Sequence, residues 1–202
     1  MNPLSYEQEQ KKLNEGFANI AGVDEVGRGP WAGPVMAAAV ILDPKNIPEG
    51  MKDSKKLSAK KREILYEEII ATAQVGIGEA SVEEIDEINI RQATFLAMTR
   101  ALENLPTKPD FVFIDGRDIP ENIETLAEAV IKGDNIVLSI SAASIVAKVT
   151  RDRLMGDLAQ KYPYFAWERN AGYGTKAHQE GLAMHGITPH HRKSFAPIRK
   201  LL

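Results

Sequence analysis

The chain has 202 residues, of which 44% are hydrophobic and 26% charged, and its formal net charge is -3; this composition excludes a disordered protein. It contains no cysteine, which excludes a disulfide framework and a thiolate metal site. The longest apolar run, residues 35–42, is far too short to cross a bilayer, and the polar N-terminus has no secretory pattern. We therefore expect a soluble, cytoplasmic protein with a single domain over residues 1–202.

Charge is distributed unevenly along the chain. Residues 1–150 carry 16 Lys and Arg against 24 Asp and Glu, whereas residues 151–202 carry 9 against 4 and all four histidines. Such asymmetry is a hint of polyanion binding, although a basic solvated tail explains it equally well. The histidines do not form a zinc pattern, so none of them is interpreted as a metal ligand.

The hydrophobic pattern predicts strands mixed with helices. A leading segment, about residues 1–18, includes a short helix near residues 6–13. Strands are expected at 20–25, 35–42, 75–80, 111–114 and 129–131. Helices are expected at 58–73, 90–105, 136–162 and 175–185, and residues 163–174 are expected to form a loop. This order predicts an α/β core followed by a C-terminal helical extension, about residues 163–202.

Two helix starts carry more detailed predictions. Ser58 opens the helix 58–73, whose side chains at core-facing spacing are Ile64, Leu65, Ile69 and Ile70. The sequence Ser81-Val-Glu-Glu84 matches a capping box, in which the Ser and Glu side chains satisfy free amides at a helix start reciprocally.

Residues able to do chemistry first gather between Ile20 and Pro34. An apolar run ends in Asp24 and Glu25, and the turn Gly27-Arg28-Gly29 follows with exposed amides and one guanidinium. Neighbouring residues of a strand face opposite sides of a sheet, so both carboxylates can line one pocket only where the strand ends or bulges. An ordinary Gly/Pro turn with a solvated acidic pair is the alternative reading.

Two further acids, Asp115 and Asp134, also fall at predicted strand ends. Each lies in a turn-like sequence, and Asp134 could simply cap the next helix. Sites in open α/β sheets gather outside strand ends, where four carboxylates would raise one another's pKa. Oxygen ligands without Cys or His suit Mg²⁺ or Mn²⁺, and such ions stabilise charge in phosphoryl-oxygen chemistry.

Possible phosphate and sugar contacts surround these acids in the sequence. They are Lys55 and Lys56 before a helix start, Ser144 and Lys148 on one helix face, and Tyr173 between two glycines, where a ring can stack on a sugar or base. Each has an ordinary alternative: a solvated lysine pair, a surface ion pair of Lys148 with Asp152, and a tyrosine packed in the core.

Six motifs, in order and spacing, resemble bacterial ribonuclease HII, the type 2 ribonuclease H. The resemblance runs from about Ile20 to the C-terminus. Its motifs are Asp-Glu-Val-Gly-Arg-Gly-Pro-Trp-Ala-Gly-Pro (24–34), Asp-Ser-Lys-Lys-Leu (53–57), Ile-Asp-Gly (114–116), Lys-Gly-Asp (132–134), Ser-Ala-Ala-Ser-Ile-Val-Ala-Lys-Val-Thr-Arg-Asp (141–152) and Gly-Tyr-Gly-Thr (172–175).

The resemblance implies a ribonuclease H-like fold, with a five-stranded mixed sheet flanked by helices and a C-terminal helical extension. It implies hydrolysis of the RNA strand of RNA–DNA hybrids and nicking 5′ of single ribonucleotides in duplex DNA, by a metal-ion mechanism that leaves 5′-phosphate and 3′-hydroxyl ends.

The resemblance also implies roles for particular residues. Matching the family's catalytic and metal-binding carboxylates are Asp24, Glu25, Asp115 and Asp134. Gly27, Arg28 and Gly29 match a motif that reads the ribose 2′-OH and the adjoining phosphate, and Tyr173 matches a tyrosine that stacks on the next deoxyribose. Which of Lys55 and Lys56 contacts phosphate stays open.

Two alternatives remain at this point. Ribonuclease HIII resembles the chain in fold but has an extra N-terminal domain, for which about 19 residues before the first strand are too few. A non-catalytic nucleic-acid-binding module on the same fold is the other. We expect a monomer with no membrane partner, and no clear clamp-binding peptide is evident near Leu202.

Overall fold

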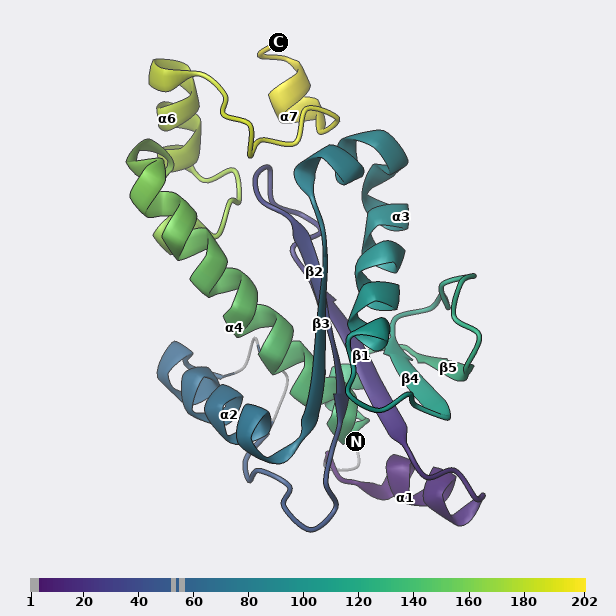
Figure 1. The fold of residues 1–202 in the computed structure, drawn as a ribbon. Coiled ribbons are helices and arrows are strands. Elements are labelled where there is room, and N and C mark those ends of the chain that lie inside the picture. The colour runs from purple at the N-terminus through teal and green to yellow at the C-terminus, as the bar shows by residue number, and fades with distance from the viewer. Residues whose placement is uncertain (1–3, 52–53, 55–56) are drawn as a thin grey trace.

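A five-stranded mixed sheet forms the centre of the computed structural model, which describes residues 4–51, 54 and 57–202 (Figure 1). The strand order is β3-β2-β1-β4-β5. The first three strands pair antiparallel, whereas β4 and β5 run parallel to β1. The strands are β1 (Ile20–Val26), β2 (Val35–Ile41), β3 (Gln74–Ala80), β4 (Phe111–Asp115) and β5 (Leu126–Val130). The predicted five-stranded mixed sheet is confirmed.

Helices cover both faces of the sheet. Helix α3 (Val82–Glu103) packs on one face, and α4 (Leu138–Lys161) crosses the other with α2 (Ala59–Thr72) beside it (Figure 1). Strand β2 is buried along its whole length, because both of its faces meet helices. Its unbroken apolar sequence already indicated this double burial.

Strand β5 is the element whose bounds the sequence predicted least well. It begins at Leu126, three residues before the expected start at Ala129. It lies at the edge of the sheet, and Leu126 is 64% exposed. Pairing with β4, in which Phe111 lies opposite Leu126, determines the start of this strand. An exposed edge strand has no clear apolar alternation from which to predict it.

Helix α2 corrects one prediction about the core. Ser58 caps it by accepting a hydrogen bond from the Lys61 amide, as expected. Leu65 and Ile69 are buried, but Ile64 and Ile70 are 45% and 42% exposed. The helix packs along one narrow stripe against α4, and residues four apart occupy that stripe. The other two isoleucines flank the stripe and face solvent.

Helix α3 has two starts. The predicted capping box is present, because Ser81 Oγ accepts from the Glu84 amide while Glu84 accepts from the Ser81 amide. Asn89 interrupts the helix at a φ of 68°, and its side chain accepts from the amides of Arg91 and Gln92. This second cap explains why helical periodicity in the sequence was clear only from residue 90.

The leading helix α1 (Glu7–Asn14) supplies the cap of α4. Val137, at the N-cap of α4, offers no side-chain hydrogen bond. Instead Glu9, fully buried, accepts from the Ser139 amide at 2.7 Å and from its hydroxyl at 2.8 Å. A carboxylate at a helix N-terminus is favoured by the free amides and the helix dipole.

The C-terminal extension is more ordered than the sequence predicted. Within the expected loop 163–174 the chain forms a 3₁₀ turn (Pro163–Phe165) and α5 (Trp167–Asn170). Helix α6 (Lys176–His185) confirms the helix predicted at 175–185, and a short helix, α7 (Ala196–Arg199), follows it. They pack around a separate cluster centred on Phe165 and Trp167. Those two aromatic anchors were hidden because Pro163 before them and the glycines at 172 and 174 after them are typical of a loop.

The extension lies over the loop between β1 and β2 (Figure 1). The Trp31 amide donates to the Gly172 carbonyl at 2.8 Å, and the Gly33 amide donates to the His190 carbonyl at 2.9 Å. The loop that contains Gly27-Arg28-Gly29 is therefore part of one surface with the extension. No helix within the described ranges is long and apolar enough to span a bilayer.

Candidate active site

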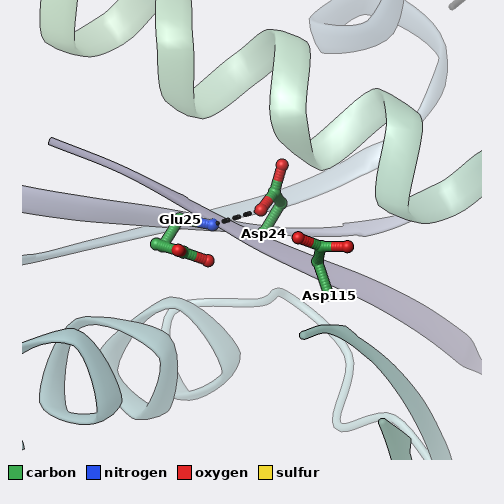
Figure 2. Close-up of side chains that lie close together, drawn as sticks. All are labelled: Asp24, Glu25 and Asp115. Atoms are coloured by element: carbon green, nitrogen blue, oxygen red, sulfur yellow. Dashed lines mark hydrogen bonds between the residues drawn. The ribbon is translucent and has the colours of Figure 1, made fainter. Parts of the chain in front are cut away.

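Three acidic side chains converge where β1 and β4 meet. Asp24, Glu25 and Asp115 each place a carboxylate oxygen within 4.8 Å of the other two (Figure 2). Asp24 is buried, and the other two are partly exposed. We call these three residues the carboxylate cluster. Asp115 comes from the last position of β4, 91 residues further along the chain.

The route by which neighbours on one strand reach a shared site is visible in the strand pairing. Asp24 and Glu25 neither end nor bulge β1, which stays in regular register with β2 through Val26. The expectation of a strand end or bulge there was wrong. What stops is the pairing with β4, whose last partners are Val23 and Ile114. Beyond that point the sheet opens between β1 and β4.

The opened sheet lets both faces contribute to one site. Asp24 points toward α4 and Glu25 toward α3, as strand alternation requires (Figure 2). Asp115 stands at the end of β4 between them. The carboxylate cluster therefore straddles the sheet at the opening, so that neither face alone contains it.

Charge within the carboxylate cluster is only partly neutralised. Asp24 Oδ1 accepts from the Glu25 amide at 2.7 Å, and Asp115 Oδ1 accepts from the Gly133 amide at 2.6 Å. Burial raises the pKa of Asp24 well above its usual value, and the charges of Glu25 and Asp115 raise it further. Burial likewise raises the pKa of Asp115. Buried anions that remain this close favour a bound cation.

Asp134 lies beside the carboxylate cluster rather than within it. It sits in a 3₁₀ turn (Gly133–Asn135) between β5 and α4, not at the end of the strand. Its charge contributes to raising the pKa of Asp115, so the two carboxylates are close. Its Oδ1 accepts from the Asn135 side chain at 2.7 Å. The predicted fourth carboxylate is thus a neighbour of Asp115 that stands outside the carboxylate cluster.

Serine hydroxyls stand behind Asp24. Ser144 on α4 is buried, hydrogen-bonds the Asp24 carboxylate and lies 2.9 Å from Ser54 Oγ. The structure thus places Ser144 against a carboxylate, and Ser54 was not singled out from the sequence. One turn further along α4, Lys148 pairs with Asp152 at 2.6 Å, the ordinary alternative considered for it. Lys55 and Lys56 lie outside the described residues.

The turn after β1 and the predicted stacking tyrosine lie together. Tyr173 is 50% exposed. A methyl group placed on Gly29 would lie 3.3 Å from the Tyr173 ring, so the ring rests against the glycine backbone. Arg28 is half exposed, and its guanidinium is 3.5 Å from Glu25. Turn, tyrosine and carboxylate cluster therefore form one continuous surface.

A cavity of about 180 Å³ opens on the α3 side of the carboxylate cluster. It is lined by Glu25, Arg28, Arg91, Asp115, Arg117 and Asp118, among others. A larger hollow, about 430 Å³, lies at the far end of α3. Its charged lining residues are Glu103, Lys108 and Glu124, of which the last two lie 3.9 Å apart. Among the described residues, no group of three acids converges there. The smaller cavity is therefore the candidate site.

Two functional candidates were given no role from the sequence, although one of them, Arg151, lies in the motif 141–152. Arg151 and Arg192 are 1% and 0% exposed, and both lie under the loop between β1 and β2. In the sequence they were two of the nine basic residues that give the C-terminal part its positive charge. Nothing local distinguishes them from solvated arginines. The positive charge that residues 151–202 present at the surface is correspondingly smaller.

The chain is similar to known proteins over nearly its whole length. The family model described as Ribonuclease HII matches residues 21–198. The chain belongs to the ribonuclease HII family. Ribonuclease HII of Ruegeria pomeroyi is 58% identical over 202 residues, which are 100% of this chain and 86% of that protein. The resemblance read from the six motifs is thereby confirmed.

Solved structures agree with this assignment. The ribonuclease H2 of Pyrococcus horikoshii matches with a TM-score of 0.78 and 31% identity over 91% of this chain and 97% of that one. The structure of the PCNA:RNase HII complex from Archaeoglobus fulgidus matches with a TM-score of 0.74 and 31% identity over 87% of this chain and 94% of that one.

The family assignment decides between the alternatives. Ribonuclease HII, not its sister ribonuclease HIII, is the family matched. Relatives of this identity make the chain a type 2 ribonuclease H, an endoribonuclease, which sets aside the non-catalytic module. Its substrates are therefore nucleic acids.

Proposed function

We propose that this ribonuclease HII nicks duplex DNA on the 5′ side of single embedded ribonucleotides and also cleaves the RNA strand of RNA–DNA hybrids. The products are 5′-phosphate and 3′-hydroxyl ends. The observation that carries this proposal is the continuous surface on which the carboxylate cluster, the Gly27–Gly29 turn and Tyr173 lie side by side. Such a surface can hold the scissile phosphate and read the sugars beside it.

A divalent metal, Mg²⁺ or Mn²⁺, fits the acidic part of this surface. Asp24, Glu25 and Asp115 offer only hard oxygen donors, and burial, followed by the charge of neighbouring carboxylates, raises the pKa of Asp24 and of Asp115. Asp134 is proposed as a further ligand because it is close to Asp115. When bound, such ions lower the pKa of a water nucleophile and stabilise charge on the leaving oxygen.

The residues of this chain orient the substrate. The backbone at Arg28 and Gly29 is exposed, and Gly29 has no side chain to keep a 2′-OH away from its amide. The 2′-OH alone marks a ribonucleotide within DNA. Arg28, half exposed beside Glu25, is proposed to contact the adjoining phosphate. Tyr173 is proposed to stack on the following deoxyribose. Lys148 is proposed as a phosphate contact and Ser144 as a support for Asp24.

A gel assay tests this proposal directly. A duplex with one ribonucleotide, its all-DNA counterpart and a continuous hybrid are each incubated with the protein and Mg²⁺ or Mn²⁺, with and without EDTA. We expect a single nick 5′ of the ribonucleotide, hybrid cleavage, an intact all-DNA duplex, and loss of all cleavage in EDTA. Cleavage of the hybrid without any nick at the single ribonucleotide would contradict the proposed substrate.

A further inference from the structure

Two buried arginines form a clamp beneath the turn that is proposed to read ribose. Neither Arg151 nor Arg192 pairs with a carboxylate among the described residues, since both donate to backbone carbonyls. Arg192 donates to Gly27 O at 2.6 Å, Arg28 O at 3.1 Å and Gly33 O at 2.9 Å. Arg151 donates to Ala32 O at 3.0 Å, Pro34 O at 2.9 Å and Ala171 O at 2.9 Å.

Burial of two like charges is unfavourable, yet Arg151 and Arg192 are both almost fully buried. Burial lowers the pKa of Arg192 to about 9, with a further contribution from the charge of Arg151. Burial also lowers the pKa of Arg151 to about 10. Both values leave the side chains charged at neutral pH. Six charge-assisted hydrogen bonds to carbonyls offset the desolvation, and all but one go to residues 27–34.

The glycines of this segment make room for the clamp. Gly27 has a φ of +92°, and a methyl group there would lie 2.3 Å from Arg151 Nε. At Gly33, with a φ of +81°, a methyl group would lie 2.4 Å from Met155 Sδ and 3.2 Å from Arg151 Nη2. Glycine is therefore required at both positions for two reasons: the positive φ, and the neighbouring side chains that leave no room for a methyl group.

The clamp also determines which way the peptide groups of the turn face. In a planar trans peptide the C=O of one residue and the N–H of the next point in opposite directions. Because the carbonyls of Gly27 and Arg28 point inward to Arg192, the amides of Arg28 and Gly29 point outward. Neither amide donates to a described residue. Two donors are thereby presented on the surface beside Tyr173.

We infer that Arg192 is a positioning residue that turns the Arg28 and Gly29 amides toward the ribose and phosphate, and that Arg151 holds this turn at a set distance from the tyrosine loop. Arg151 can do so because it bonds both Ala32 and Ala171, two residues before Tyr173. The inference rests on the proposed function of the turn. It adds that discrimination for ribose depends on side chains that never touch the substrate.

Arg192→Lys isolates the effect of the clamp, because one ammonium group keeps the charge but cannot span three carbonyl oxygens. Equilibrium binding is measured in an Asp115→Asn background, for a duplex with one ribonucleotide and for the same duplex in all-DNA form. We expect the preference for the ribonucleotide to fall about tenfold or more, while affinity for all-DNA duplex stays unchanged. Arg153→Lys, two residues from Arg151 but on the surface and paired with Glu63 and Glu67, should keep the preference.

The outcomes separate three explanations. An unchanged preference in Arg192→Lys overturns the inference, as does an equal loss of affinity for both duplexes, which would mark a merely structural role. If the Asp115→Asn parent itself shows no preference, the proposed reading of ribose fails instead. For Arg151→Lys we expect a larger loss of cleavage on the single-ribonucleotide duplex than on a continuous hybrid, and equal losses would overturn its part.

A second measurement uses the unmodified protein and needs no substrate. In NMR spectra the Nε proton of Arg192, bonded to Gly33 O, should exchange slowly with water, whereas the backbone amide protons of Arg28 and Gly29 should exchange fast. Slow exchange of both amides, or fast exchange of the Nε proton, overturns the clamp whether or not Arg192→Lys folds.

Discussion

The carboxylate cluster and the arginine clamp are two charged groups of opposite sign, and they differ in how far hydrogen bonds compensate their charge. Both include buried charge. The guanidiniums of the clamp are bonded to six carbonyl oxygens. The acids share few donors, and burial and mutual repulsion raise the pKa of two of them. A satisfied buried charge acts as scaffold, whereas an unsatisfied one is available for a ligand.

The largest effect is expected from removing one charge of the carboxylate cluster. Asp115→Asn should keep the fold, because an amide oxygen can still accept from the Gly133 amide, but it should lower metal-dependent nicking by about 100- to 1,000-fold or more. The rate is measured on the single-ribonucleotide duplex. Asp118→Asn is the matched control, since Asp118 lines the same cavity but pairs with Arg91. Near-normal nicking by Asp115→Asn would contradict the site.

A smaller effect is expected on the recognition side. Tyr173→Ala should lower nicking at a single ribonucleotide about tenfold more than cleavage of a continuous hybrid. Loss of an aromatic ring that stacks on a base costs roughly 1–3 kcal/mol, and a tenfold loss on the following sugar lies at the lower end of that range. The ratio of the two kcat/KM values is the measurement. Tyr164→Ala is the control, since that ring is similarly exposed but stacks on His185. Equal losses on both substrates would argue against a junction-reading tyrosine.

Metal binding should stabilise the protein, and more so at higher pH. The folded-state pKa values of Asp24 and Asp115 are raised. Without metal, therefore, the free energy of unfolding falls as pH rises from the ordinary pKa range of an aspartate to the raised pKa values of these two acids. Mn²⁺ at about 100 times its Kd should compensate the buried negative charge and add about 3 kcal/mol of stability. Thermal unfolding with Mn²⁺ and with EDTA should differ more at about pH 8 than at about pH 5, and Asp115→Asn should lose most of the difference.

The smallest effect concerns the buried acid Glu9, one of whose carboxylate oxygens accepts two hydrogen bonds from Ser139. Glu9→Ala removes the cap of α4 and should lower the free energy of unfolding by about 1–3 kcal/mol. Glu9→Gln keeps an acceptor for Ser139 and should lie closer to the wild type. Burial raises the pKa of Glu9, so wild-type stability from this group falls as pH rises above about 4.5. Denaturant unfolding across that range checks this, and a Glu9→Gln protein with the same pH slope would contradict it.

Sequence analysis predicted most of the fold because its signals were local. The capping box at Ser81, the apolar β2 and the long α4 follow from side-chain periodicity and caps. The edge strand β5 and the helices within residues 163–174 were missed or shortened, because pairing and packing with distant residues define them. Ile64 and Ile70 were assigned to the core because their spacing fits a helix face. The stripe of α2 that packs is narrower, and both side chains are exposed.

The sequence by itself determined the family, the acidic candidates and the glycine-rich turn, since residue types and spacing carry that information without coordinates. Tertiary structure alone decided that Asp24 and Glu25 reach one site although they face opposite sides of the sheet, because pairing with β4 stops at Val23. It also decided that Arg151 and Arg192 are buried. A guanidinium has the same sequence signature in solvent and under a turn, and only the carbonyls that surround it in the fold distinguish the two.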